Sequence, residues 1–226
     1  MKRGKKYNNA LKLIDKNKEY SLDEALELLP QTSTTNFDST VEVHIKLGID
    51  PKKSDQQVRT TVTLPHGTGK KRRIAVFAEG KAADDAKAAG AEVVGGEDLI
   101  EEIKRTGKTD FDIALATPEM MKHLAKIARI LGPRGLMPNP KADTVTPDIK
   151  KAMEDLSKGK QEIKNDRSGN IHVGIGKVSF PKEQLKENFL ALLEAVRQAK
   201  PEESKGTYIK SVTLTTTMGP GIKVKV

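Results

Sequence analysis

The sequence predicts two domains of mixed structure: an α+β domain with a mainly antiparallel sheet, interrupted by an inserted Rossmann-like α/β domain. Near both ends of the chain, predicted strands alternate apolar with polar residues, which is typical of a sheet buried on one face. In the middle, short strands are apolar throughout and are separated by helices, which indicates a parallel sheet covered on both faces. We therefore expect residues 1–66 and 160–226 to form one discontinuous domain and residues 67–159 to form the inserted one.

Two helices are expected before the first strand. The first carries three apolar residues among polar ones, namely Leu11, Leu13 and Ile14. The second begins at the sequence SLDE, residues 21–24, because Ser at the cap and Glu three residues later match a capping box. We expect this helix to run through Leu29 and to end with the help of Pro30, which has no backbone N–H to donate.

Strands with one buried face are expected in both outer segments. Residues 41–49 place apolar side chains at every second position, and residues 57–64 and 171–175 repeat the pattern. In the last strand, residues 210–219, the apolar face is opposed by hydroxyl side chains, namely Ser211, Thr213, Thr215 and Thr217. A long amphipathic helix is expected before it, from Pro181 to about Gln198. We expect these one-sided strands to share one sheet.

The inserted domain alternates fully buried strands with helices. Its three strands are expected at residues 74–77, 91–94 and 111–115. An Ala-rich helix follows the first strand, and a second helix starts at Glu97. We expect the closing helix to be capped by Thr146 and to start at Pro147, because Pro is favoured at the first helical position.

The composition indicates a polyanionic partner. The chain carries a formal net charge of +9, and Lys and Arg side chains drive association with nucleic acid by releasing counterions from phosphates. The surplus of basic residues is seven in the predicted outer domain and two in the inserted domain, so we expect the nucleic-acid surface mainly on the outer domain. Only 4% of the residues are aromatic. We therefore expect recognition by shape and by contacts to phosphate and sugar, rather than by stacking bases on several aromatic rings.

The sequence argues against several classes of protein. Zero cysteines exclude a disulfide framework and thiolate zinc sites, and no apolar stretch reaches the roughly 18 to 20 residues that span a bilayer. Residues 67–70, GTGK, lack the rest of a phosphate-binding loop, and the first inserted strand is not followed by the glycine pattern of a dinucleotide site. The four histidines are scattered, and no Ser or carboxylate pair suggests catalysis. We expect no enzyme activity, no catalytic residue, no cofactor and no metal.

Four features stay open on composition and spacing alone. The run at residues 70–73 is either a solvated charge cluster or an RNA contact. The loop at residues 132–141 is either a rigid connector or a binding loop that displays its two cations. Phe37 is either a hydrophobic staple or an RNA-facing ring. The hydroxyls at residues 211–217 either contact RNA 2′-hydroxyls and phosphates or reflect the preference of Thr for strands.

Three long segments carry a resemblance to a known family. They are FDSTVEVHIKLGIDPKKSDQQVR at 37–59, RILGPRGLMPNPKADTVT at 129–146 and SVTLTTTMGPG at 211–221. In this order they closely resemble the bacterial ribosomal protein L1 family, and the resemblance spans nearly the whole chain. It implies a cytoplasmic protein, monomeric within the ribosome, that binds 23S rRNA to form the mobile stalk of the large subunit.

The resemblance implies further partners and a set of site residues. The partners are exit-site tRNA, whose movement and release the family assists, and the protein's own operon mRNA, whose translation it represses; no membrane is implied. The RNA-binding residues that carry over are Phe37, Thr40, Glu42, Arg167, Ser168, Ser211, Thr215, Thr217, Met218 and Gly219. Asn36 departs from the basic residue usual at that place in the family, so one phosphate contact is expected to be missing.

Overall fold

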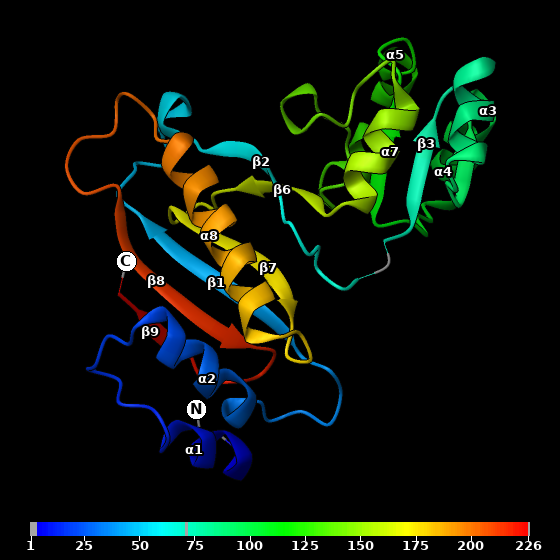
Figure 1. Ribbon diagram of the computed structural model, residues 1–226. Coiled ribbons are helices and arrows are strands. Elements are labelled where there is room, and N and C mark those ends of the chain that lie inside the picture. Colours follow the sequence, from blue (N-terminus) through cyan, green and yellow to red (C-terminus); the bar gives the residue numbers. More distant parts are fainter. Residues whose placement is uncertain (1–3, 71, 226) are drawn as a thin grey trace. The chain divides into compact units, whose positions relative to one another are not determined.

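The computed structural model describes residues 4–70 and 72–225, which form two compact units (Figure 1). The outer unit comprises residues 1–69 and 159–226, and the inserted unit comprises residues 70–158. One contains an antiparallel sheet and the other a parallel sheet, each with helices. The predicted mixed α/β fold class is thereby confirmed. Lys71, in the middle of the basic run at 70–73, lies outside the described residues.

The main sheet of the outer unit has four antiparallel strands in the order β7-β1-β8-β9. Their bounds are β7 Asn170–Lys177, β1 Thr40–Leu47, β8 Ile209–Thr216 and β9 Ile222–Val224. The predicted alternation is confirmed: every second residue of β1 from Val41 to Leu47 is at most 1% exposed, whereas Glu42, His44 and Lys46 between them are partly exposed. One face of the sheet is therefore the core and the other is polar.

A second, two-stranded sheet corrects the expectation that all one-sided strands share one sheet. Strand β2, Arg59–Thr63, pairs with β6, Lys160–Lys164, and not with the four-stranded sheet. The reason is that β1 already has both of its edges occupied, by β7 and by β8. The apolar side chains of β2 and β6 nevertheless join the same core, where Val62 and Ile163 are buried.

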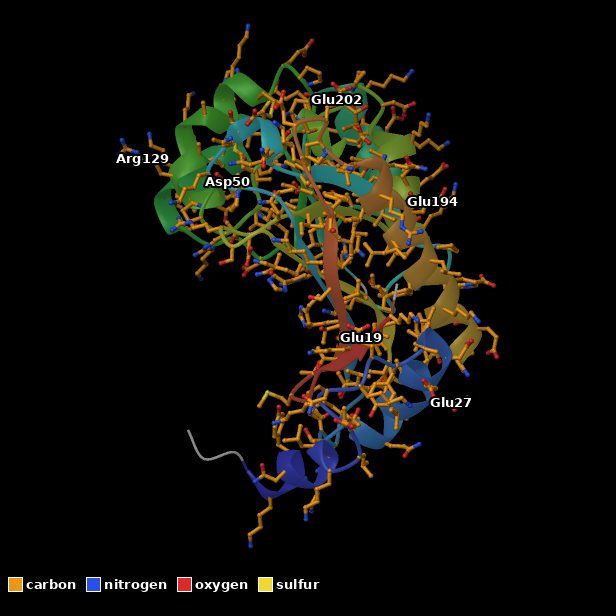
Figure 2. The ribbon with its side chains drawn as sticks, turned by 90° about the vertical axis from the view of Figure 1, so that its left-hand side faces the viewer. Glu19, Glu27, Asp50, Arg129, Glu194 and Glu202 are labelled. Atoms are coloured by element: carbon orange, nitrogen blue, oxygen red, sulfur yellow. The ribbon has the colours of Figure 1, made fainter. Side chains whose placement is uncertain are left out.

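In its described residues the outer unit has three helices, α1 Lys5–Leu11, α2 Leu22–Thr32 and α8 Lys182–Gln198, with a 3-10 turn η1 at Ser54–Gln56. Helix α2 packs against α8, β8 and β9, and α8 also packs against β7 and β2. Figure 2 views the sheet from the side, and there Glu27 of α2 and Glu194 of α8 project away from the same side of the sheet. The helices thus form one layer on the apolar face.

The helix ends differ in part from expectation. The capping box of Ser21 and Glu24 is confirmed, but α2 continues past Pro30 to Thr32. It does so because the carbonyl of Pro30 still accepts the N–H of Ser33, and the Thr32 hydroxyl donates to the carbonyl of Leu29 at 3.1 Å. Leu13 and Ile14 both lie beyond the end of α1, so their assignment to the opening helix is wrong. Leu13 is 50% exposed, whereas Ile14 packs in the core.

The inserted unit has three parallel strands in the order β4-β3-β5, with apolar cores on both faces, as predicted. The strands are β3 Ile74–Phe77, β4 Val93–Gly95 and β5 Ile113–Ala116. The helices are α3 Lys81–Ala88, α4 Glu97–Thr106, α5 Met121–Leu124, α6 Ala128–Leu131 and α7 Ile149–Ser157, with 3-10 turns η2 Ala125–Ile127 and η3 Pro140–Ala142. Helix α7 is capped by Asp148, whose carboxylate accepts the N–H of Lys151, and not by Thr146, whose hydroxyl accepts the N–H of Asp148.

The proline-rich loop at residues 132–141 is held from within. Thr144 and Asn139 bind each other through backbone and hydroxyl, with the Asn139 N–H 2.7 Å from the Thr144 hydroxyl. Leu136 and Met137 pack against a core of the unit, and Arg134 stays exposed. These contacts fix the loop within its own unit, which favours the rigid connector over the binding loop. No helix in residues 4–70 or 72–225 is long and apolar enough to cross a membrane.

Candidate nucleic-acid interface

The polar face of the four-stranded sheet, opposite α2 and α8, is called here the open face. Strand pairing arranges its side chains in three rows centred on β1. The rows are Gly174–Glu42–Thr215, His172–His44–Thr213 and Asn170–Lys46–Ser211. Successive residues on one face of a strand are about 6.6 Å apart, so these rows extend over more than about 10 Å. These three rows therefore offer hydroxyls, imidazoles and the ammonium group of Lys46 side by side.

At one end of the open face, β1 and the chain beyond β8 are joined by Thr217. Its N–H donates to the carbonyl of Thr40 at 3.0 Å, and its hydroxyl accepts the N–H of Thr40 at 3.1 Å. Thr40 itself is only 7% exposed, and its hydroxyl accepts from Lys177 at 3.4 Å. Thr40 thus supports the strand end, whereas Thr217 is part of the surface.

Two large apolar side chains protrude next to this join. Phe37 is 61% exposed and Met218 is 74% exposed. The hydroxyl of Thr34 donates to the carbonyl of Met218 at 3.3 Å, which ties the loop before β1 to the turn after β8. Burying such a side chain is worth about 1.5 to 3 kcal/mol, so both residues leave that gain unused in the free protein. The exposure of Phe37 rules out the hydrophobic staple.

The loop that carries Phe37 is anchored on both sides of it. The carboxylate of Asp38 accepts the N–H and the hydroxyl of Ser179 at 3.1 and 2.8 Å. The hydroxyl of Thr35 donates to the carbonyl of Phe37 at 3.1 Å. The ring therefore stands exposed on a backbone whose position is already fixed, which reduces the entropy cost when it contacts a partner.

The turn after β8 is tight and strained. Met218 has a φ of +65°, a left-handed conformation that non-glycine residues seldom adopt and that costs roughly 1 to 2 kcal/mol. A Cβ on Gly219 would lie 2.3 Å from the Thr216 hydroxyl oxygen, so only glycine fits there. Strained residues held by their surroundings occur mainly at functional sites. We call Phe37, Thr217, Met218 and Gly219 the strand-end patch.

Arg167 and Ser168 lie at the opposite end of the open face. They occupy the turn from β6 to β7, where the carboxylate of Asp166 accepts the N–H groups of Ser168 and Asn170 at 2.8 and 2.7 Å. These hydrogen bonds, led by that from Asn170, lower the pKa of Asp166 to about 2. Lys46 then donates to the carbonyl of Ser168 at 2.5 Å. Because Thr40 and Lys46 are six residues apart on β1, the two groups of predicted residues are roughly 20 Å apart.

The structure therefore brings the predicted residues to one face but not to one cluster. Glu42, Ser211 and Thr215 lie on the open face between its two ends. The residues carried over from the family leave out six members of these rows, namely Gly174, His172, His44, Thr213, Asn170 and Lys46. Composition and spacing alone leave the role of the Thr213 hydroxyl open. The alternation of β1 placed Lys46 on the polar face, but only the register of three strands shows which residues stand beside it.

A histidine pair occupies the centre of the open face. The Nδ1 atoms of His44 and His172 are 2.7 Å apart, and the Nε2 of His44 is 3.8 Å from a carboxylate oxygen of Glu42. Partial burial, followed by the nearby His172, lowers the pKa of His44. At this distance one neutral ring donates its Nδ1–H to the Nδ1 of the other, so the two imidazoles form one hydrogen-bonded unit.

The inserted unit offers no comparable site for a phosphate among its described residues. A cavity of about 440 Å³ lies at the carboxyl ends of its strands, where doubly wound sheets bind ligands. Its lining includes Glu79, Glu119 and His123, and the glycine pattern that cradles a pyrophosphate is missing from the sequence after β3. In residues 4–70 and 72–225, no three metal-binding side chains converge.

Comparison with known proteins identifies the family. Residues 29–220 match the model of the ribosomal protein L1p/L10e family. The "Large ribosomal subunit protein uL1" of Thermosipho melanesiensis is 56% identical over 223 residues, which cover 99% of this chain and 96% of that protein. The protein of the same name from Chloroflexus aurantiacus is 55% identical over 225 residues, or 99% and 95% of the two chains. The family consists of ribosomal constituents rather than enzymes. The chain, as its sequence motifs predicted, belongs to the ribosomal protein L1p/L10e family.

Proposed function

We propose that this protein is a constituent of the large ribosomal subunit, located in the cytoplasm, and that it binds 23S rRNA through the strand-end patch and the open face. The names of its relatives support the ribosomal role. The observation that carries the RNA site is the pair of exposed apolar side chains, Phe37 and Met218, fixed beside Thr217 at the end of a polar sheet face.

Recognition here depends on shape more than on charge. The strand-end patch carries no ionised side chain, and its turn exposes backbone groups next to a thioether and an aromatic ring. Such groups contact sugars and unstacked bases, whereas cations contact phosphates without reading sequence. The open face adds Ser211, Thr213 and Thr215, whose hydroxyls suit 2′-hydroxyls and phosphate oxygens.

The finer roles belong to the same proposal. The RNA-binding domain is the discontinuous one predicted at residues 1–66 and 160–226, and the inserted domain, residues 67–159, carries no part of the main RNA site. The bound protein and its rRNA form the mobile stalk beside the exit site, where they assist the movement and release of deacylated tRNA. The same surface binds the protein's own operon mRNA and represses its translation, because both RNAs present the same shape to one patch.

Filter binding with a 23S stalk fragment and the leader mRNA tests this proposal. Met218→Ala or Thr217→Val is expected to weaken binding of both RNAs by roughly 1 to 3 kcal/mol at fixed salt without unfolding the protein. The matched control is Leu190→Ala, since Leu190 is an apolar side chain of α8 that is 49% exposed. Equal affinities of the Met218→Ala and Leu190→Ala proteins would refute the site.

A further inference from the structure

A basic cavity lies at the edge of the four-stranded sheet that is formed by β9. Its volume is about 510 Å³. Its walls come from the end of α8, the start of β8 and the end of β9, with Glu19 at one side. Glu19 is labelled in Figure 2 and marks this edge of the sheet. We call this cavity the basic groove.

The groove exists because β9 is short. It pairs with β8 only from Val212 to Leu214, so the backbone of residues 209–211 has no strand beside it on that edge among the described residues. The other side of β9 is closed by Tyr20, whose N–H donates to Lys223 at 3.0 Å and whose carbonyl accepts from Lys225 at 2.9 Å. Along the described part of this edge, the backbone of β8 is thus left unpaired where β9 ends.

Among the described residues, five cations line this opening, against one carboxylate, that of Glu19. They are Arg197, Lys200, Lys210, Lys223 and Lys225. None of the five side chains forms an ion pair with another residue in the described part of the chain. Like charges gathered without partners repel one another and destabilise the free protein, and an anion removes that repulsion.

A buried hydroxyl group in the lining also lacks a partner. Tyr208 is 7% exposed, and within the described residues its hydroxyl makes no hydrogen bond. Burial raises the pKa of Tyr208 to about 12, so the group stays a neutral donor at ordinary pH. An unsatisfied buried hydroxyl costs roughly 1 to 3 kcal/mol. The lining of the groove therefore combines cations without ion-pair partners and one residue whose buried hydroxyl has no partner among the described residues.

The groove is continuous with the open face. Ser211 lies in the row of Lys46 on that face and also lines the groove. Lys223 pairs with Thr213 across β8 and β9, so it shares the open face and lines the groove as well. A bound polymer that extends from the open face across the β9 edge would reach the basic groove next.

We propose that the basic groove binds consecutive phosphates of the same RNA that occupies the open face, as a second binding region that follows the edge of the sheet. This inference rests on the proposed function and extends its RNA path. The cations come from three separate segments and line the opening from several sides, which suits a phosphodiester chain. The groove has no glycine-rich loop in its described lining, which a site for a single phosphate commonly uses. The groove supplies affinity, and the strand-end patch supplies specificity.

The test compares two variants of the protein that each lose two positive charges. The double variant Lys223→Gln and Lys225→Gln removes two groove cations, and the control Lys12→Gln and Lys16→Gln removes two exposed cations of the N-terminal region. Binding of the 23S stalk fragment is measured from low to high KCl. For the groove variant, the magnitude of the slope of log K against log salt is expected to decrease by about 0.7 to 0.9 for each phosphate that it no longer neutralises. Its binding at low salt is expected to be roughly tenfold weaker. The control is expected to keep the wild-type slope.

Two further readouts separate the possible failures. Ethylation interference is expected to show a set of phosphates whose modification weakens the wild-type protein but not the groove variant. A slope equal to that of the control would overturn the groove while leaving the strand-end patch intact, provided that Met218→Ala still weakens binding. Inorganic phosphate that competes with RNA at constant ionic strength would instead assign the groove to a single phosphate and overturn the RNA path. A wild-type protein that fails to bind the fragment would refute both proposals.

Discussion

The strand-end patch and the basic groove belong to one sheet and present opposite chemistry. The patch is uncharged and strained, and it exposes Phe37 and Met218 on fixed backbone. The groove is charged, and its cations stand on the long and flexible side chains of Lys and Arg. Fixed apolar and backbone groups discriminate between RNA shapes, whereas mobile cations attract any phosphate chain. Net charge alone therefore points to the region of lower specificity.

The largest effect is expected from Gly219→Ala, which breaks the patch and leaves the groove unchanged. The new Cβ would meet the Thr216 hydroxyl at 2.3 Å and the Thr32 carbonyl at 3.2 Å. We expect the free energy of unfolding to fall by about 1 to 3 kcal/mol and specific RNA affinity to fall by at least as much, because the turn must shift. Urea unfolding and filter binding measure the two quantities.

A rescue and a control decide whether this effect comes from the turn. Thr216 is buried and its hydroxyl has no partner among the described residues, so Thr216→Ala removes the obstructing atom without breaking a hydrogen bond. The double variant is expected to recover part of the stability that Gly219→Ala removes. Gly4→Ala is the control, because nothing lies within 4 Å of a Cβ at that position. Equal losses of stability in the single and double variants would contradict the proposed clash.

A middle-sized effect is expected from Tyr208→Phe, which tests the groove without changing its charge. The hydroxyl makes no hydrogen bond among the described residues, so its removal is expected to raise the free energy of unfolding of the free protein by about 1 kcal/mol. Binding of RNA is expected to weaken, so stability and affinity move in opposite directions. Thermal unfolding with and without the stalk fragment checks this, and a less stable free protein would show that the hydroxyl already has a partner.

The sequence predicted the local features of both regions but not their assembly. Alternation in residues 41–49 and 210–219 is a property of each strand, so the polar and apolar faces followed from it directly. Pairing is not local: both edges of β1 are taken by distant strands, which left β2 to pair with β6. The prediction of one shared sheet failed for that reason.

For the candidate site, too, the sequence predicted individual residues but not how they are brought together. The residues carried over by family resemblance include Phe37 and Met218, which composition alone left undecided and which the structure exposes. The basic groove had no sequence signal, because its cations come from three segments separated by up to 28 residues, from Arg197 to Lys225. Only the short length of β9 and its register bring them around one cavity.

The smallest effect concerns the histidine pair, which lies between the two regions. The folded pKa of His44 is lowered, first by partial burial and then by His172, so folding disfavours its protonated form. By linkage, this contribution to stability is present above the ordinary value of 6.5 and is lost as the pH falls through the lowered pKa. Glu42, 3.8 Å away, opposes the shift, and solvent screens the half-exposed ring, so we expect a smaller change than for Tyr208→Phe.

Comparison of the wild type with His44→Gln isolates this contribution. The free energy of unfolding of the wild type is expected to fall more than that of the variant between about pH 7.5 and pH 5.5, where only the wild type has a titrating ring at this place. Asp166 stays ionised over this interval because its pKa is about 2, so it adds no slope of its own. Parallel pH profiles would mean that protonated His44 is as stable in the folded protein as in the unfolded chain, and that the centre of the open face accepts a proton without cost.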